Sequence, residues 1–148
     1  MNNLKVEVES REVDDFIREI EDDETRRQII LEGLKSGAKV LQKNTQELFK
    51  SRMGTGAFHF SRFIKKPFYE GVKVIVDKAY NETIVSILSD YRMRFYEKGT
   101  KDRKTKKGYR RGQLQSLHFF KDARSNSENE IDNAINSSID LALRKYLL

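Results

Sequence analysis

The side chains that could do chemistry in this sequence are few, and their spacing matches no common active site. His59 and His118 are the only histidines, and cysteine is absent, which excludes thiolate nucleophiles and cysteine-based zinc or iron–sulfur centres. Neither histidine lies in a His-Glu-x-x-His motif, and no serine lies in a Gly-x-Ser-x-Gly motif. Gly54-Thr55-Gly56 lacks the Gly-Lys-Ser/Thr ending of a phosphate-binding loop. The sequence therefore predicts no catalytic residue, no metal and no cofactor.

One enzymatic interpretation stays open, that of a metal-free ribonuclease. Such an enzyme uses cations to stabilise the pentavalent phosphate and a titrating group to move protons. The candidate residues for this chemistry are Arg103, Tyr109, Arg110, Arg111 and His118. Catalysis requires side chains held within about half an ångström, and this polar run predicts no such rigidity. We therefore expect that the chain is not an enzyme.

Charge is the most informative feature of the sequence, because it is very unevenly spread. The net charge is +6. Residues 1–50 contribute −3, residues 51–91 contribute +2, residues 92–111 contribute +8, and residues 112–148 contribute −1. Residues 92–111 alone thus contribute more positive charge than the net charge of the whole chain. It predicts a surface that attracts phosphates or an acidic partner, or else a solvated loop that repels itself into an open conformation.

The centre of this stretch, residues 98–112, predicts a long basic loop that is mobile. It has no apolar periodicity and contains three glycines. Loops of this length in a compact domain are usually functional or disordered. The predicted contacts with a partner or with nucleic acid are seven of its cations, Lys101, Arg103, Lys104, Lys106, Lys107, Arg110 and Arg111.

The remaining pattern predicts one α+β domain over residues 1–148. Ser10 is a suitable N-cap for a first short helix that includes Phe16, Ile17 and Ile20. A long second helix is expected over about residues 25–50. Its apolar stripe is Ile30, Leu34, Ala38, Leu41 and Leu48.

Gly33 and Gly37 lie one turn apart near this stripe, where each costs about 1 kcal/mol relative to alanine. They indicate either that another part of the backbone packs closely there or that they are incidental. In the final helix, Ile131, Ile135, Ile139, Ala142 and Tyr146 share one face, and Ser127 with Glu130 has the form of a capping box at its start.

Between the long helices the sequence predicts a β-hairpin. Residues 71–77 and 82–88 are rich in β-branched side chains that alternate, and Tyr80-Asn81 can form the turn. Residues 58–69 are aromatic and basic and contain the only proline, so no continuous element is expected there. Residues 92–97 fit a third strand and a short helix equally well. The predicted fold is therefore α+β, with long N-terminal and C-terminal helices packed on a small antiparallel sheet. No apolar run reaches the roughly 18 residues of a membrane span.

Three segments in order resemble the small minor tail, or tail-completion, proteins of long-tailed bacteriophages and prophages. Gly33-Leu34-Lys35-Ser36-Gly37-Ala38 followed by Thr55-Gly56-Ala57-Phe58-His59-Phe60-Ser61 is similar to the "Thr-Gly-x-Leu-x-x-Ser" region after that family's first long helix. Tyr91 to Thr100 resembles its "Tyr-Ala-x-x-x-Glu-x-Gly-Thr" segment. Arg111-Gly112 through Phe119-Phe120-Lys121-Asp122-Ala123 resembles its closing "Pro-Phe-Leu-x-Pro-Ala". This chain lacks both of those prolines and has an arginine after Tyr91.

The resemblance implies a non-enzymatic virion structural protein that acts in head–tail joining or tail completion. It implies a homo-oligomeric ring that binds tail-tube or connector proteins, in the neck or tail of the virion after assembly in the bacterial cytoplasm. In such a ring, the basic loop would reach either the acidic helical surface of a neighbouring subunit or DNA in the lumen, without reading its bases. The alternative interpretation is a basic nucleic-acid-binding protein, with the ribonuclease as its enzymatic form.

Overall fold

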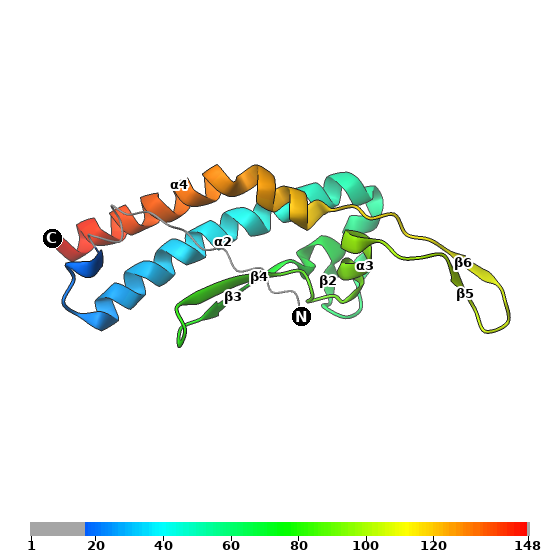
Figure 1. Cartoon of the computed structure of the whole chain (residues 1–148), viewed down its shortest axis with the longest axis horizontal. Coiled ribbons are helices and arrows are strands. Elements are labelled where there is room, and N and C mark those ends of the chain that lie inside the picture. Colours follow the sequence, from blue (N-terminus) through cyan, green and yellow to red (C-terminus); the bar gives the residue numbers. More distant parts are fainter. Residues whose placement is uncertain (1–16, 148) are drawn as a thin grey trace. The chain divides into compact units, whose positions relative to one another are not determined.

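A computed structural model describes residues 17–147 of the chain (Figure 1). The helices are α2 (Asp23–Met53), α3 (Arg92–Lys98) and α4 (Phe119–Leu147), with the 3-10 helices η1 (Gly54–Phe58) and η2 (Phe68–Gly71). The strands are β1 (Phe60–Ser61), β2 (Lys66–Pro67), β3 (Lys73–Asp77), β4 (Glu82–Ser86), β5 (Arg103–Lys104) and β6 (Arg110–Gly112). They pair as β1–β2, β3–β4 and β5–β6, in small antiparallel sheets. The predicted α+β class is confirmed.

The described chain divides into two compact units. Unit 1 contains residues 17–42, 74–85 and 127–147, and unit 2 contains residues 43–73 and 86–126. Residues 23–42 of α2 and 127–147 of α4 belong to unit 1, whereas residues 43–53 of α2 and 119–126 of α4 belong to unit 2. The single domain that the length indicates stays a prediction.

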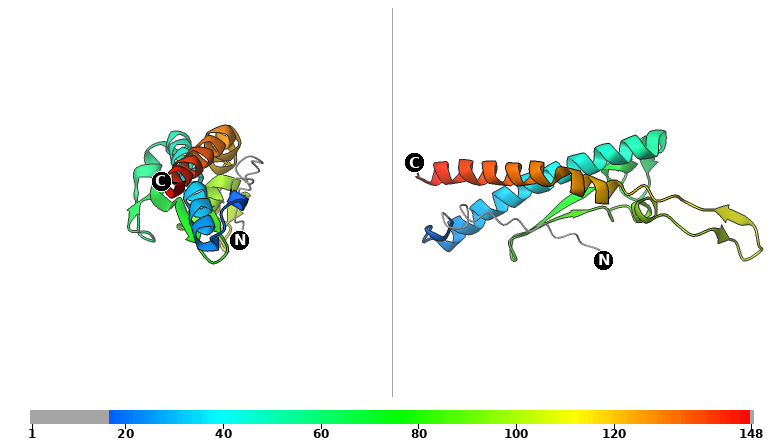
Figure 2. Two further views of the ribbon diagram at one scale, coloured as in Figure 1. Left: turned by 90° about the vertical axis from the view of Figure 1, so that its left-hand side faces the viewer. Right: turned by 45° about the horizontal axis from the view of Figure 1, so that its top comes forward.

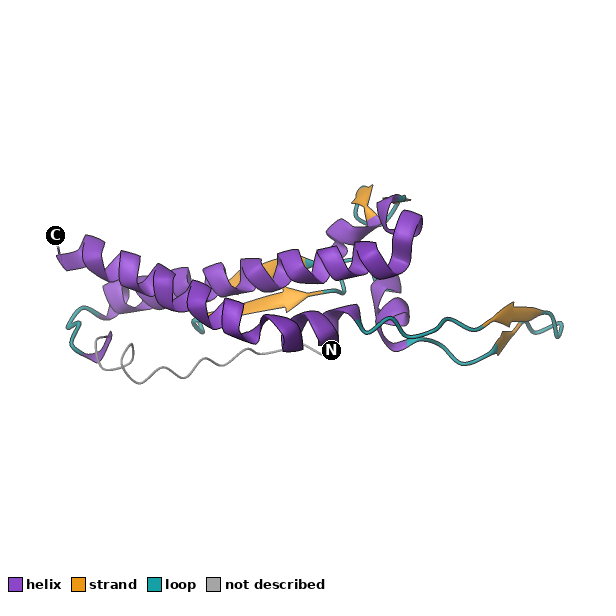
Figure 3. Ribbon diagram, turned by 90° about the horizontal axis from the view of Figure 1, so that it is seen from above, coloured by secondary structure: helices purple, strands orange, loops and turns teal. Residues whose placement is uncertain are grey.

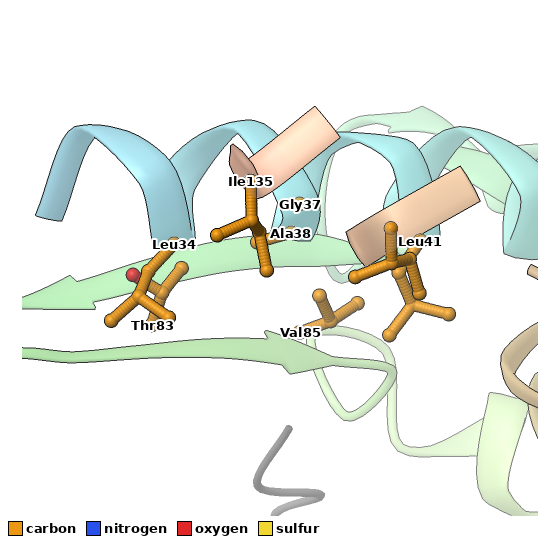
Figure 4. A pocket seen from close by; sticks show the side chains of 8 residues that line it. Leu34, Gly37, Ala38, Leu41, Thr83, Val85 and Ile135 are labelled. Atoms are coloured by element: carbon orange, nitrogen blue, oxygen red, sulfur yellow. The ribbon is translucent and has the colours of Figure 1, made fainter. Parts of the chain in front are cut away.

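In unit 1, the parts of α2 and α4 that belong to it lie side by side and pack on the β3–β4 hairpin. A Cβ atom at Gly33 would lie 2.6 Å from Cγ1 of Ile139, and one at Gly37 would lie 2.6 Å from Cγ1 of Ile135. The two glycines therefore make room for isoleucine side chains of α4, so they are not incidental, although side chains, and not the backbone that the spacing predicted, fill the space beside them. Figure 4 shows Thr83 and Val85 of β4 facing the side chains of α2 and Ile135 of α4.

In unit 2, the core is aromatic and centres on Phe49, which is fully buried in the last turns of α2. Its ring centroid lies 5.2 Å from that of Phe68, 4.8 Å from that of Phe119 and 6.4 Å from that of Tyr96. The edge-to-face arrangements with Phe68 and Tyr96 are the geometry that aromatic rings prefer. The core thus joins three helices and η2 around one side chain.

The long α2 helix is where the sequence predicted it, although its most buried stripe is displaced by one position. Ala38 and Leu41 are buried as expected, whereas Ile30, Leu34 and Leu48 are half-buried. The stripe also includes Ile29, Thr45 and Phe49, which are buried. The predicted first helix lies largely outside the described residues, but Ile17 and Ile20 are buried and Ile17–Arg18 is helical.

Two other expectations are settled by the structure. The β3–β4 hairpin confirms the predicted strands, with the turn at Lys78–Asn81 between them. Residues 92–97, which fitted a strand or a helix, belong to helix α3. Residues 58–69 form the short β1–β2 pair between two 3-10 helices, so the expected break in regular structure is confirmed.

The predicted start of the C-terminal helix is wrong. Helix α4 begins at Phe119, and Ser127 is a buried residue inside the helix rather than its N-cap. The capping-box pattern at Ser127 and Glu130 gave the wrong start because the side chain that caps α4, Glu97, lies outside this helix.

Within residues 17–147, none of the helices has both the length and the apolar character that crossing a bilayer requires.

Candidate functional site

The basic loop predicted over residues 98–112 forms a long arm between α3 and α4, which we call the basic arm (Figure 2). Figure 3 shows that strand structure occupies only its distal part, where β5 and β6 pair. The absence of alternating apolar residues hid this hairpin from the sequence analysis. All seven of the predicted contact cations lie on the arm and are exposed to solvent.

The base of the arm is held by a set of hydrogen bonds. The Gly99 amide donates to the Phe95 carbonyl at 2.8 Å, and the Thr100 amide donates to the Leu114 carbonyl at 2.9 Å. The Leu114 amide donates back to Oγ1 of Thr100 at 3.0 Å. Gly99 has a φ of +74°, and a Cβ atom there would lie 2.9 Å from the Leu114 carbonyl oxygen. The chain therefore leaves α3 by a turn that only glycine fits.

Glu97 joins the arm base to the start of α4. Its carboxylate accepts hydrogen bonds from the backbone amides of Phe120 at 2.8 Å and Lys121 at 3.1 Å. These two amides lie in the first turn of α4, where they have no partner within the helix, and the negative charge also suits the positive end of the helix dipole. Glu97 is buried. The Glu97 side chain therefore caps the N-terminus of α4. Glu97 itself belongs to α3, and the whole basic arm separates the two in the sequence.

At its distal part, the arm brings like charges together. Lys104 and Arg110 are cross-strand partners in the β5–β6 pair, and like charges placed directly opposite destabilise a hairpin. Asp102 offsets part of this repulsion through an ion pair with Arg110 at 3.0 Å. A two-stranded hairpin is at best marginally stable in water, so this one would gain stability from any anionic surface that it contacts.

The five ribonuclease candidates do not form a catalytic cluster in the described chain. Arg103, Arg110 and Arg111 lie on the two strands of the arm, and Tyr109 lies in its exposed turn. His118 precedes α4 at the base of the arm, where its backbone amide donates to the Glu97 carbonyl. No hydrogen bond or ion pair joins any two of these five side chains there. The described structure therefore does not bring the candidate histidine, tyrosine and arginine side chains together at one point.

A second surface of unit 2 combines exposed aromatic rings with arginines. The rings of Phe63, Tyr91 and Phe95 form a row, with centroids 5.0 Å and then 6.2 Å apart. They are 59%, 54% and 42% exposed. Arg94, which directly precedes Phe95 in α3, is also exposed. We call these four residues the aromatic patch.

The aromatic patch rests on a buried polar network. Asp90 is fully buried, and its carboxylate accepts hydrogen bonds from the Ser61 hydroxyl at 2.6 Å and from Nε and Nη2 of Arg92 at 2.9 and 2.6 Å. The Arg92 guanidinium lies 5.1 Å from the ring centroid of Phe63 and 4.8 Å from that of Phe68. The network therefore fixes the arginine against the Phe63 and Phe68 rings and ties β1 to the start of α3.

The charges of this network stabilise each other. Burial alone would raise the pKa of Asp90, but the hydrogen bonds from Arg92 and Ser61 outweigh it and hold that pKa below the ordinary value of 3.8. The hydrogen bond to Asp90 raises the pKa of Arg92 further. Both groups are therefore charged at neutral pH, and the pair acts as a structural ion pair rather than as an acid or base.

The sequence did not predict that Glu97 caps α4, that Asp90 is the centre of a buried network, or that the aromatic patch exists. Phe63 and Tyr91 are far apart in the sequence and meet only in the fold. One signal was present: Tyr91, Arg94 and Phe95 share one face of a helix at spacings of three and four. This spacing predicts a shared face only if the segment is helical, and residues 92–97 fitted a strand equally well.

The hollows of unit 1 do not resemble a substrate site. A cavity of about 20 Å³ lies among Thr83 and apolar residues of α2, β4 and α4 (Figure 4), which is room for about one water molecule. An open groove of about 510 Å³ lies between α2 and α4 and is partly lined by Thr25, Leu141 and Tyr146. Among residues 17–147, no cluster of three or more histidine or acidic side chains is arranged to hold a metal ion.

No protein-family model, no curated protein and no solved structure matches this chain.

Proposed function

We propose that this chain is a non-enzymatic structural protein of the head–tail joining or tail-completion region of a long-tailed bacteriophage or prophage. In this proposal it assembles with copies of itself, in a ring, and binds tail-tube or connector proteins. It acts in the neck or tail of the virion after assembly in the bacterial cytoplasm. The three sequence segments that resemble that family support the viral context, and the geometry of unit 2 supports assembly.

The basic arm is the observation that carries the proposal. Its base is fixed by the hydrogen bonds of Gly99, Thr100 and Leu114 and by the Glu97 cap. Its distal part exposes cations that repel one another across the hairpin. An arm that is fixed at its base and carries far more cations than its single acidic residue, Asp102, suits docking onto an acidic surface of another subunit. Bond-making chemistry would require an enclosed group of reacting side chains instead.

The alternative function, nucleic-acid binding, is favoured by one observation. Unit 2 places exposed aromatic rings in the same unit as the cations of the arm, and proteins that bind nucleic acid without sequence preference combine these two features. The ribonuclease form of this alternative gains no support from the placement of His118 and the arginines.

The test is a charge reversal at the tip, Lys104→Glu/Lys106→Glu/Lys107→Glu. We expect the triple variant to stay monomeric at concentrations at which the wild type forms discrete oligomers, as measured by light scattering after size exclusion. Lys35→Glu/Lys39→Glu/Lys43→Glu is the matched control, because it reverses three exposed lysines of α2; it should assemble like the wild type. Tip-reversed protein that still forms the wild-type oligomer but no longer binds duplex DNA would overturn the proposal in favour of nucleic-acid contact.

A further inference from the structure

The two units carry opposite net charges. Counted over its described residues, unit 1 holds 8 basic and 12 acidic residues, a net charge of −4. Unit 2 holds 19 basic and 6 acidic residues, a net charge of +13. One polypeptide therefore presents two surfaces of opposite sign. Two copies can satisfy this complementarity when unit 2 of one meets unit 1 of the other.

Unit 2 offers a surface with the composition of an interface hot spot. Its aromatic patch joins three exposed rings with Arg94, and tyrosine and arginine dominate the binding energy of protein interfaces. The Arg92 guanidinium lies against the Phe63 ring, and the Phe63 amide donates to the Ser61 hydroxyl at 3.3 Å, so the Phe63 end of the row is held in place and loses little conformational freedom when a partner binds. Exposed rings in one row on a protein surface usually mark a site of interaction.

Unit 1 offers a matching surface, the groove between α2 and α4. Leu141 and Tyr146 line this groove and are 60% and 47% exposed. Thr25, which also lines it, directly follows the segment Glu21–Glu24, whose four acidic side chains are all exposed. Glu32 adds a further carboxylate and Lys145 one cation to the lining. The groove thus combines apolar contact area with an adjoining acidic segment.

We infer that the aromatic patch of one copy docks into the α2–α4 groove of a second copy. The rings contact Leu141 and Tyr146, and Arg94 lies toward the acidic segment Glu21–Glu24. Because the patch and the groove are different surfaces of the same chain, the contact is heterologous and leaves each pair of copies with one free patch and one free groove. Repeated addition then gives a ring if the rotation closes. The inference rests on the proposed function in one respect, that the chain assembles with itself.

The geometry of the rings favours a protein partner over single-stranded nucleic acid. Phe63 and Tyr91 lie at 81° to each other, and Tyr91 and Phe95 lie at 88°. Successive bases stack on the faces of successive rings, which requires rings that present roughly parallel faces. Neighbouring rings that stand edge to face suit the irregular, closely packed contacts of a protein interface instead.

The test uses two variants that each lack one side of the contact. Arg94→Glu/Phe95→Ser removes the patch, and Glu21→Lys/Leu141→Lys removes the groove; all four positions are exposed. Each variant alone should be monomeric by sedimentation velocity, because neither retains both surfaces. An equimolar mixture should form a dimer and nothing larger, since one intact patch meets one intact groove. Arg124→Glu, an exposed position of unit 2 on α4, is the matched control and should assemble like the wild type.

Folding of each variant is checked by circular dichroism and thermal unfolding. A milder pair, Phe95→Ala and Leu141→Ala, should each weaken self-association about tenfold. Variants that keep the wild-type oligomer would overturn the docking inference and leave the proposed function standing. Folded monomers that do not pair on mixing would also overturn it. Binding of a 5′-labelled oligothymidylate probe that Arg94→Glu/Phe95→Ser abolishes would assign the patch to nucleic acid. A wild type that is itself monomeric would instead refute the proposed function.

Discussion

Replacing Asp90 with alanine is expected to lower the free energy of unfolding by about 3 kcal/mol, the largest effect that we expect from one side chain of the candidate site. The change leaves the buried Ser61 hydroxyl and the Arg92 guanidinium without their acceptor. The Arg92 side chain is 40% exposed, so water partly solvates the arginine and keeps the loss below that of a fully buried ion pair. Urea unfolding followed by circular dichroism measures the difference.

The control for this variant is Asp102→Ala, which breaks the exposed ion pair with Arg110 in the basic arm. Exposed pairs contribute less than about 1 kcal/mol, so that variant should unfold nearly like the wild type. Equal losses from the two substitutions would mean that the Asp90 network is no more important than a surface pair.

The same network predicts a pH dependence. The pKa of Asp90 lies below 3.8 in the folded chain and near that value in the unfolded chain. Its charge therefore adds stability at pH values above 3.8, and this contribution is lost as the pH falls through the folded pKa. The stability difference between the wild type and Asp90→Asn should be constant near neutrality and shrink in acid, where the wild-type carboxyl is also neutral. A difference that stays constant in strong acid would contradict this account.

Replacing Glu97 with alanine is expected to cost about 2 kcal/mol, because two first-turn amides of α4 lose their acceptor and the helix dipole loses its counter-charge. The conservative change Glu97→Gln keeps one oxygen and should cost about half as much. Native-state hydrogen exchange should show faster exchange at the amides of Phe120 and Lys121, while the amides of α4 beyond Ser127 keep their protection. Under the proposed function, we expect the same substitution to loosen the base of the arm and weaken assembly.

Glu128→Ala is the control for Glu97, since Glu128 is an exposed glutamate of α4 outside its first turn. It should leave the exchange at Phe120 and Lys121 unchanged. If Glu97→Ala behaves like Glu128→Ala in both measurements, the carboxylate does not cap the helix.

Much of the fold could be predicted because its determinants are local. The stripe of α2 and the isoleucines of α4 recur at helical spacing, and the two strands of β3–β4 alternate around a short turn. Such patterns lie within one element, so the sequence carries them directly. The location of the basic arm in the sequence and its positive charge were also predicted, because its composition differs from that of the rest of the chain.

The errors arose where the determinant is distant in the sequence. The start of α4 depends on Glu97, more than twenty positions before Phe120, so the local Ser127–Glu130 pattern gave the wrong boundary. The aromatic patch depends on Phe63 meeting Tyr91, and the buried network depends on Ser61 meeting Asp90. Neither pairing has a local signature. Helix α3 is too short for its periodicity to distinguish it from a strand.

The central claim, that this chain is a self-assembling docking protein, is tested most directly by the molar mass of the wild type in solution. Sedimentation equilibrium over a wide range of concentration, at low and at high salt, measures it. The account predicts a discrete oligomer at low salt that dissociates as salt screens the charges between the units of neighbouring copies. A chain that stays monomeric at every concentration in low salt would contradict the account.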